Sequence, residues 1–323
     1  MNPSFQKLNL LLGKLQSSLG SKQSTLTLTD QRAVEDNFSL DYIPEFTAQN
    51  LAQGILGQPQ NTKGVTHCDI KVSMPAVPTS VFGTPPNVND FLLSSGLKQT
   101  AADFPFTYVQ SDDIVKDCSA LTLWGYSGDK VGANSLLTKT HSAMFDCKIS
   151  GELGKPCMFE FTGKGAIATT PANASYPSGM TLLSDSIPVI IKTTEMTVDD
   201  ITLKILKFDV TIGNVIEMVK DASQDYGYVQ STIVGRSVKF TAQVLQEDLG
   251  TSENNSIKKM DDQTTGDFGI TFGDSVYSIS INSASGKCHI TSVKQAAEAG
   301  LNVFDISGVF INNDLQILFY YVT

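Results

Sequence analysis

The residue types that most often carry chemistry are scarce in this chain and poorly spaced for it. The histidines are His67, His141 and His289, and two of them stand beside a cysteine, Cys68 or Cys288. Adjacent residues of a β-strand point to opposite faces, so neither pair can hold one metal ion from one face. No HxxxH, HExxH or CxxC spacing accompanies them. We therefore expect ordinary strand histidines and no metal site.

Other catalytic patterns are absent or incomplete. The chain has no GxSxG nucleophile elbow. Residues 151–156, GELGKP, lack both the spacing of a phosphate-binding loop and the helix that should follow it. The acidic residues in 112–117 and 199–200 are better explained as turns between strands than as a glycosidase pair, and Trp124 is the single tryptophan that could support a sugar ring. The sequence predicts no enzyme, no catalytic or cofactor-binding residue, and no cofactor.

Composition narrows the class of protein further. The chain has 323 residues, 41% of them hydrophobic, which is enough for about two domains of ~150 residues. Only 17% of residues are charged, and Ser, Thr, Gly and Asn are abundant, which is typical of a turn-rich β protein. The net charge of −10 argues against a protein that grips nucleic acid or docks on anionic membranes. No apolar stretch is long enough to span a bilayer.

Cysteine usage and the N-terminus bear on the compartment. The 5 cysteines form no CxxC pair and are odd in number, which favours reduced thiols and assembly in a cytoplasm. Near the N-terminus the leucines at 8, 11, 12 and 15 recur at helical spacing, and Gly20 follows as a stop. This pattern predicts an amphipathic helix rather than a signal peptide.

One strand is written twice along the chain. Residues 154–163, GKPCMFEFTG, and 300–308, GLNVFDISG, share a glycine, a spacer, an apolar–acidic–apolar core around Phe159 or Phe304, and a closing Ser/Thr-Gly. Earlier segments recur in the same order: 64–74 returns as 235–244, and 120–126 as 267–281. Loose alternation shared by any two β-rich segments is the alternative, but the ordered recurrence favours a duplicated unit.

Several local features complete the expected architecture. Residues 87–94 read as a short helix capped by Asn87 and stopped by Gly96, and residues 292–299 as a second short helix. The apolar face of 201–214 changes phase, which predicts a bulge near Ile205. By alternation, four side chains should face the cores and Asp305 should point outward; the four are Phe159, Phe161, Phe304 and Ile306.

These observations predict a mainly β fold with two similar β-sandwich or β-barrel domains and short flanking helices. The expected divisions are an N-terminal helix and arm in 1–40, a first domain in 41–165, a linker in 166–185 and a second domain in 186–323. The linker is expected because residues 165–185 are rich in Ala, Thr, Pro and Ser.

The order of the motifs resembles one family. The chain is similar to the tail tube (major tail) proteins of tailed bacteriophages, of the larger two-domain type. The motifs that carry the resemblance cover most of residues 10–245 and include LLGKLQSSLGS (11–21), NVNDFLLSSGLKQT (87–100), SGELGKPCMFEFTGKG (150–165), FDVTIGN (208–214) and GYVQSTIVGRSVKF (227–240). The polar segment 246–267 departs from the family pattern.

The resemblance implies a structural virion protein, located in the tail and assembled in the host cytoplasm. Neighbouring sheets would join into a closed ring, and stacked rings would form a tube through which double-stranded genome DNA passes without sequence-specific binding. A duplicated chain would close a pseudo-sixfold ring from three copies. The implied partners are further copies of the chain and the tape measure, terminator and tip proteins, and the subunit itself would not bind a membrane.

Two points stay open on the sequence alone. The acidic balance either lets DNA slide along the lumen or keeps a concentrated subunit soluble. The function is either that of a tail tube subunit or that of another binding module on duplicated β-sandwiches, such as a tail tip, adaptor or adhesin. We expect polar loops in 246–267 and 79–89 to contact a neighbouring ring.

Overall fold

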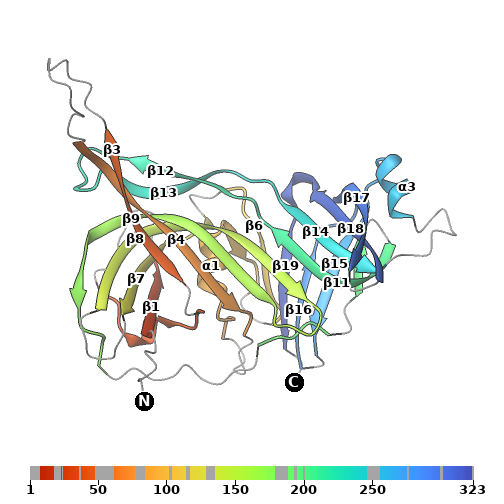
Figure 1. Ribbon diagram of the computed structural model, residues 1–323, viewed down its shortest axis with the longest axis horizontal. Coiled ribbons are helices and arrows are strands. Elements are labelled where there is room, and N and C mark those ends of the chain that lie inside the picture. Colours follow the sequence, from red (N-terminus) through yellow and green to blue (C-terminus); the bar gives the residue numbers. More distant parts are fainter. Residues whose placement is uncertain are drawn as a thin grey trace.

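The chain is mainly β, as its composition predicts (Figure 1). The computed structural model describes residues 8–17, 23, 25–35, 38–47, 62–77, 84–101, 104–113, 117–128, 135–178, 188–192, 195–198, 201–245, 255–274, 276–298 and 301–321.

One antiparallel sheet, here called the long sheet, crosses the whole molecule. Its eight strands are, in spatial order, β3 (Ser39–Thr47), β4 (Thr62–Pro75), β9 (Met158–Ala174), β8 (Ser135–Glu152), β11 (Ile201–Thr211), β14 (Lys239–Leu245), β18 (Leu301–Phe310) and β17 (Cys288–Glu298). The first four strands belong to the N-terminal half of the chain and the last four to the C-terminal half. The halves are therefore joined by the β8–β11 ladder, not by a linker alone.

A second sheet faces the long sheet and closes the core. Its strands are β5 (Leu97–Gln99), β6 (Phe106–Gln110), β19 (Gln316–Tyr321), β16 (Tyr277–Asn282), β15 (Phe268–Gly273) and β10 (Glu195–Val198), and β10 pairs with the start of β11. Aromatic rings from the two sheets meet in the middle: Phe159 stacks on Phe319, and Phe240 lies against Phe268. Because β6 pairs with β19, this sheet also crosses both halves. The division into two domains stays a prediction.

The N-terminal segment forms a strand, so the predicted amphipathic helix is wrong. β1 (Leu8–Leu15) pairs with β7 (Leu121–Gly128) and with β2 (Gln31–Arg32). Leu11 enters the main core while Leu10 and Leu12 pack with Tyr126 on the opposite face. An apolar run that is buried on both faces cannot be told from a helix by its periodicity, which explains the error.

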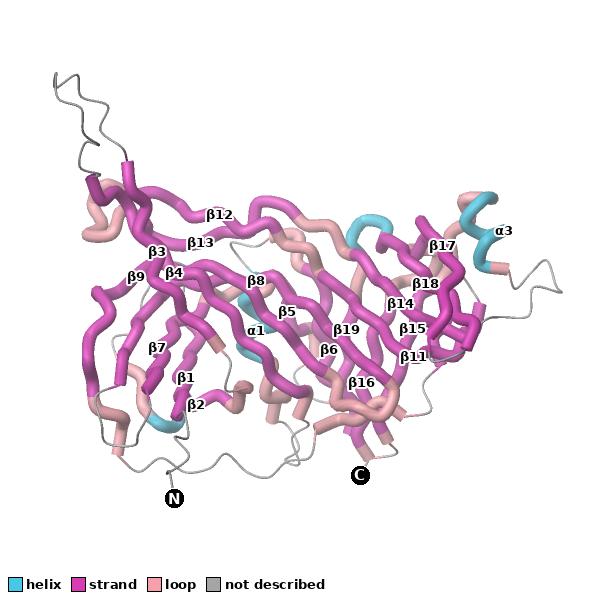
Figure 2. Tube along the Cα trace, viewed as in Figure 1, coloured by secondary structure: helices cyan, strands magenta, loops and turns pink. Residues whose placement is uncertain are grey.

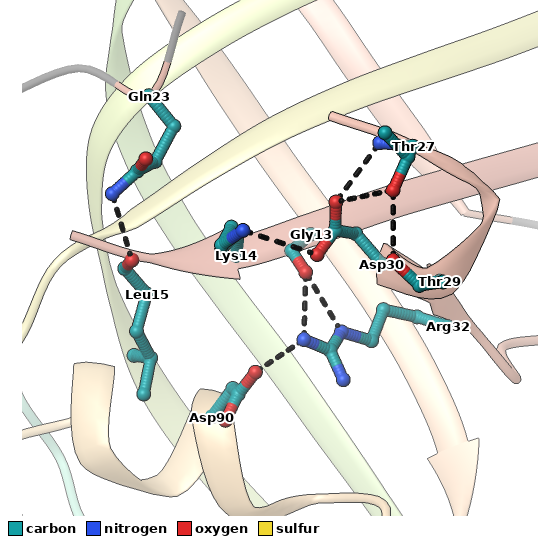
Figure 3. Close-up of polar contacts among 9 residues, drawn as sticks. All are labelled: Gly13, Lys14, Leu15, Gln23, Thr27, Thr29, Asp30, Arg32 and Asp90. Atoms are coloured by element: carbon teal, nitrogen blue, oxygen red, sulfur yellow. Dashed lines mark hydrogen bonds and ion pairs between the residues drawn. The ribbon is translucent and has the colours of Figure 1, made fainter. Parts of the chain in front are cut away.

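Side chains from the following segment fix β1 in place (Figure 3). Arg32 donates from Nε and Nη2 to the Gly13 carbonyl at 3.0 and 2.6 Å and forms an ion pair with Asp90. Lys14 Nζ of β1 lies 3.7 Å from Asp30 Oδ1, and Asp30 also accepts from the Thr27 backbone N–H at 2.9 Å within the 3₁₀ turn η1 (Leu28–Asp30). The N-terminal strand is thus tied both to its neighbouring turn and to the helix that carries Asp90.

Two of the local predictions are confirmed. The helix expected in 87–94 is α1 (Asn89–Ser94), and Gly96 follows it with φ +77. Asn87 does not cap it; its amide instead accepts from the Val77 N–H and donates to the Pro75 carbonyl. The bulge expected near Ile205 lies in β11, where the register with β14 shifts between Ile205 and Lys207.

Two other local predictions are wrong. Of the expected helix 292–299, residues 292–298 belong to β17, which pairs with β18 as far as Glu298↔Leu301, and residue 299 lies outside the described residues. Its helix-forming residues are overridden by that long hairpin. The expected linker 166–185 is also wrong in its first part, because β9 continues to Ala174, and residues 179–187 lie outside the described residues.

Two strands form a ribbon that, within the described residues, pairs with neither sheet (Figure 2). It consists of β12 (Val215–Lys220) and β13 (Tyr228–Gly235) and lies along the face of the long sheet that is turned away from the core. Two further short helices lie near the C-terminal strands: α3 (Ser256–Asp261), next to β17, and the 3₁₀ helix η2 (Ile311–Asn313).

The two halves of the long sheet have the same strand order. In chain order the first unit is β3, β4, β8, β9 and the second is β11, β14, β17, β18, and in both units the fourth strand lies between the second and the third. The register agrees as well. Phe159 lies opposite Met74 and Phe304 opposite Val244, while Gly163 lies opposite Ile70 and Gly308 opposite Phe240.

The expected repeat fails outside these four strands. β7, which contains most of 120–126, pairs with β8. Its expected counterpart 267–281 belongs to the second sheet as β15 and β16, and only the preceding residue, Gly266, forms a bridge to Cys288 of β17 among the described residues. The repeated unit is thus a four-stranded one.

Candidate functional site

Side chains alternate between the two faces of the long sheet. In the first unit Val72, Cys147 and Phe161 point into the core, as do Phe159 and Ile149. The predicted core positions Phe159, Phe161, Phe304 and Ile306 are all buried, and Asp305 points outward, which confirms the strand register. The side chains between them form a polar face on the other side of the sheet, here called the open face.

The open face carries both signs of charge and many hydroxyl groups. Its lysines include Lys71, Lys148, Lys164, Lys207, Lys239 and Lys294, and its acidic residues include Asp69, Glu160, Glu152, Asp209 and Asp305. Between the charges lie Ser73, Ser150, Thr162, Thr211, Thr241, Ser292 and Ser307.

Opposite charges on this face form ion pairs, one between strands and one within a turn. Lys148 Nζ lies 3.1 Å from Asp209 Oδ1, and Lys155 Nζ lies 2.7 Å from Glu152 Oε2 in the β8–β9 turn. Gln243 donates from Nε2 to Asp305 Oδ1 at 3.0 Å. Such half-exposed pairs add about 0–1 kcal/mol of stability each, so their main effect is on the charge that the surface presents. The face offers a polyanion little unbalanced positive charge.

A groove of about 570 Å³ lies over the second unit and the adjoining end of β8, on the open face of β8, β11, β14, β18 and β17. Its floor carries the hydroxyls of Ser150, Thr241, Ser292 and Ser307. The described residues that line it include no histidine or cysteine, so it holds no nucleophile paired with an imidazole base. The groove can offer hydrogen bonds and charge but no recognisable reaction.

The ribbon covers part of the open face of the first unit. Ser231 of β13 accepts from the Met144 N–H at 2.8 Å and donates to the Ser142 carbonyl at 2.6 Å, where Ser142 has φ +52 and β8 bulges. Ile216 and Ile233 pack there on Met144. The bulge gives the ribbon two backbone groups of β8 that the sheet itself does not use.

A buried polar cluster anchors the base of the ribbon. Asn214 donates from Nδ2 to the carbonyls of Ser95 and Phe145, at 2.7 and 2.9 Å, and accepts from Arg236 Nε at 2.8 Å. Arg236 Nη2 also donates to the Gly96 carbonyl at 2.9 Å. The two residues thus connect the base of the ribbon, where β12 begins and β13 ends, to β8 and to the end of α1.

Burial is the main cause of the pKa shifts in and beside this cluster. Desolvation raises the pKa of Asp146, which accepts from the Asn214 backbone N–H at 2.9 Å, and lowers the pKa of Arg236. Asn214 and Arg236 were not identified as functional residues by chemical spacing. The only sequence signal for them is their place in the Gly-Asn and Gly-Arg motifs that flank the ribbon.

The histidines and cysteines lie where strand alternation predicts. Cys68 points into the core, and burial raises the pKa of its thiol; His67 points outward, with Nε2 3.2 Å from Asp69 Oδ1. His289 Nδ1 lies 2.9 Å from the Thr264 carbonyl. All five cysteines lie among the described residues, and each is a buried thiol outside any disulfide. Across the described ranges, no three His, Cys, Asp or Glu side chains are placed to hold a metal ion.

Comparison with known proteins adds no identification. No protein-family model matches the chain, and no curated protein matches its sequence. Among the described residues no helix is long and apolar enough to cross a membrane. The expected ring-contact loops 79–89 and 246–267 lie partly outside the described residues, at 79–83 and 246–254.

Proposed function

We propose that the chain is a structural subunit of a phage tail tube, in which the long sheet forms part of the wall and its open face lines the lumen. The observation that carries this proposal is the long sheet itself. Two four-stranded units of equal order and register are fused side by side into one antiparallel sheet, with a core on one face and a polar surface on the other. A wall needs these two different faces.

The chemistry of the open face suits a conduit for DNA. Duplex DNA carries about one negative charge per 1.7 Å of its axis, and a lysine-rich lining would bind it at every ring. Here Lys148 and Lys155 are held by Asp209 and Glu152, and hydroxyls separate the remaining charges. A near-neutral hydroxyl-bearing wall stays hydrated and lets a polyanion slide.

The groove supports a second candidate. A polar groove of about 570 Å³ at the junction of the two units is a feature of a binding module, such as a tail tip or adaptor protein. In that case the groove would be occupied by a partner and the chain would not polymerise by itself.

Negative-stain electron microscopy of the purified, concentrated protein separates the two candidates. The tube subunit is expected to form rings or tubes with a central hole, and their assembly should not depend on a partner. Single particles at every concentration, with a partner bound over the groove, would support the second candidate and contradict the first.

A further inference from the structure

The long sheet ends in two strands that have room for another partner. Within the described residues, β3 pairs with β4 alone, and β17 pairs with β18 and has a single bridge at Cys288 on its other side. Among the described residues, no strand pairs with the second edge of β17 over residues 292–297, and α3 lies next to β17. Unpaired edges of this kind are an aggregation hazard unless something covers them.

The molecule already contains one junction between two four-stranded units. β8, the third strand of the first unit, pairs antiparallel with β11, the first strand of the second unit. In that ladder Lys148 lies opposite Thr211, and Ser150 lies opposite Asp209. The open edges are the matching strands: β17 is the third strand of the second unit, and β3 is the first strand of the first unit.

Strand register assigns the equivalent positions. Lys148 lies opposite Glu160, and Lys294 lies opposite Asp305, the acidic residue at the same place in the repeated strand. Lys239 and Asp69 are equivalent, because each comes one residue before the residue that lies opposite a closing glycine. Thr211 lies opposite Lys239 and Asp41 lies opposite Asp69, so Thr211 and Asp41 are equivalent as well. Transferred to the open edges, the β8–β11 register therefore places Lys294 opposite Asp41.

The charges at these positions fit this register. Asp41 is exposed and lies directly opposite Asp69, and like charges that face each other across a ladder are destabilising. Lys294 is also exposed and lies on the same open face. Lys164 of β9 lies opposite Asp69 on its other side, whereas Asp41 lies on the edge strand, and among the described residues no lysine lies opposite it on its outer side. Lys294 of a neighbouring copy would occupy that position and offset the remaining repulsion.

The strand directions fit as well. All seven pairs of the long sheet are antiparallel, so its two terminal strands run in opposite directions. When copies are related by rotation about an axis near the strand direction, β17 of one copy meets β3 of the next antiparallel. Repetition of this head-to-tail contact closes a ring.

We propose that β17 of one copy pairs antiparallel with β3 of the next copy, with Lys294 opposite Asp41, in the register that β8 and β11 have within the chain. The inference rests on the proposed function and names the partner of each sheet edge as a second copy of this chain. Pro44 and the irregular register between Pro44 and Phe46 limit the contact to the first part of β3.

Cysteine cross-linking tests the register. Residues directly opposite each other in an antiparallel pair have Cα atoms about 4.5–5.5 Å apart, within reach of a disulfide. Full-length protein carrying Asp41→Cys and Lys294→Cys is expected to give, after oxidation, a covalent series that ends in a closed oligomer. The matched control carries Asp41→Cys and Gln295→Cys, because Gln295 points to the other face; it should give at least tenfold less product.

Charge exchange gives a second readout in the same protein. Asp41→Lys alone and Lys294→Asp alone should each abolish assembly, and the two changes together should restore it. Folding is checked on the unassembled protein by circular dichroism. Efficient cross-linking of the control, or no rescue by the double exchange, would overturn the pairing.

The two experiments also separate this inference from the proposed function. Wild-type protein that forms tubes, while the Asp41→Cys, Lys294→Cys protein gives no disulfide-linked product, would contradict the pairing and leave the tube subunit intact. Cross-linked closed oligomers that show no central hole in the microscope would support the pairing and contradict the tube.

Discussion

The two four-stranded units of the long sheet differ in what surrounds them, although their strand order and register are the same. In the first unit the ribbon covers part of the open face, and β8 is flanked by β7 and then by β11. In the second unit the open face carries a groove, and most of β17 has an open edge within the described residues. The repeat sets the skeleton, and the segments outside it decide which surfaces remain for partners.

The two units make room for a phenylalanine ring at the closing glycine in different ways. Both closing glycines lie beneath a phenylalanine ring, where a Cβ would collide with it. Over Gly163 the ring is Phe145 of β8, and over Gly308 it is Phe240 of β14. The glycine is common to both units, while the ring comes from opposite neighbouring strands.

The largest expected effect tests whether the two cores are equivalent. Phe159 and Phe304 are buried at matching register positions. Phe159→Ala and Phe304→Ala should each lower the free energy of unfolding by about 3–5 kcal/mol, measured by urea denaturation. Asp305→Asn, on the opposite face, should cost well under about 1 kcal/mol. Equal losses at Phe304 and Asp305 would contradict the strand register.

The next largest expected effect is a loss of stability that is confined to the ribbon beside the first unit. Asn214→Ala removes two donated hydrogen bonds and leaves the carbonyls of Ser95 and Phe145 and the Arg236 guanidinium without this partner. The loss should be about 2–4 kcal/mol in thermal or chemical unfolding. It should also increase hydrogen exchange in β12 and β13, with little change in β14 and β18. Uniform exchange across both units would show that the cluster does not anchor the ribbon.

A smaller effect tests the closing glycines. Gly163→Ala would press a methyl group against the Met144 carbonyl and the Phe145 ring, and Gly308→Ala against the His289 carbonyl and the Phe240 ring. Each should cost about 1–3 kcal/mol, because rigid backbone lies on one side. Gly235→Ala is the matched control, since its Cβ would meet only Val215, at 3.7 Å. A neutral result at one closing glycine alone would break the equivalence of the two units.

The smallest effect concerns the matching lysines. Lys148 has a half-exposed ion pair with Asp209, and Lys294 is exposed at the open edge. Lys148→Ala and Lys294→Ala should each change the unfolding free energy by less than about 1 kcal/mol. Light scattering should nevertheless show slower assembly for the Lys294 variant alone. Slowed assembly in both variants would show that assembly depends on the total charge of the open face and not on a contact at the β17 edge.

The sequence predicts the four-stranded skeleton well because alternation, turn glycines and the repeated strand all act locally. Cys68, Phe159 and Phe304 are buried as their spacing predicts. The local patterns of residues 8–15 and 292–299 predict helices, whereas long-range pairing of 8–15 with β7 and of 292–298 with β18 decides the structure. The Asn214–Arg236 cluster could not be predicted from residue types, because its partners are backbone carbonyls of distant segments.

Cryo-electron microscopy of the assembled protein would show which strands meet between copies and which face lines the lumen. We expect rings of three copies in which one antiparallel sheet runs around the lumen, β17 of each copy lies beside β3 of the next, and the open face is turned inward. Six copies in each ring, a lumen lined by the second sheet, or a β17 edge that faces solvent in the assembly would contradict this expectation.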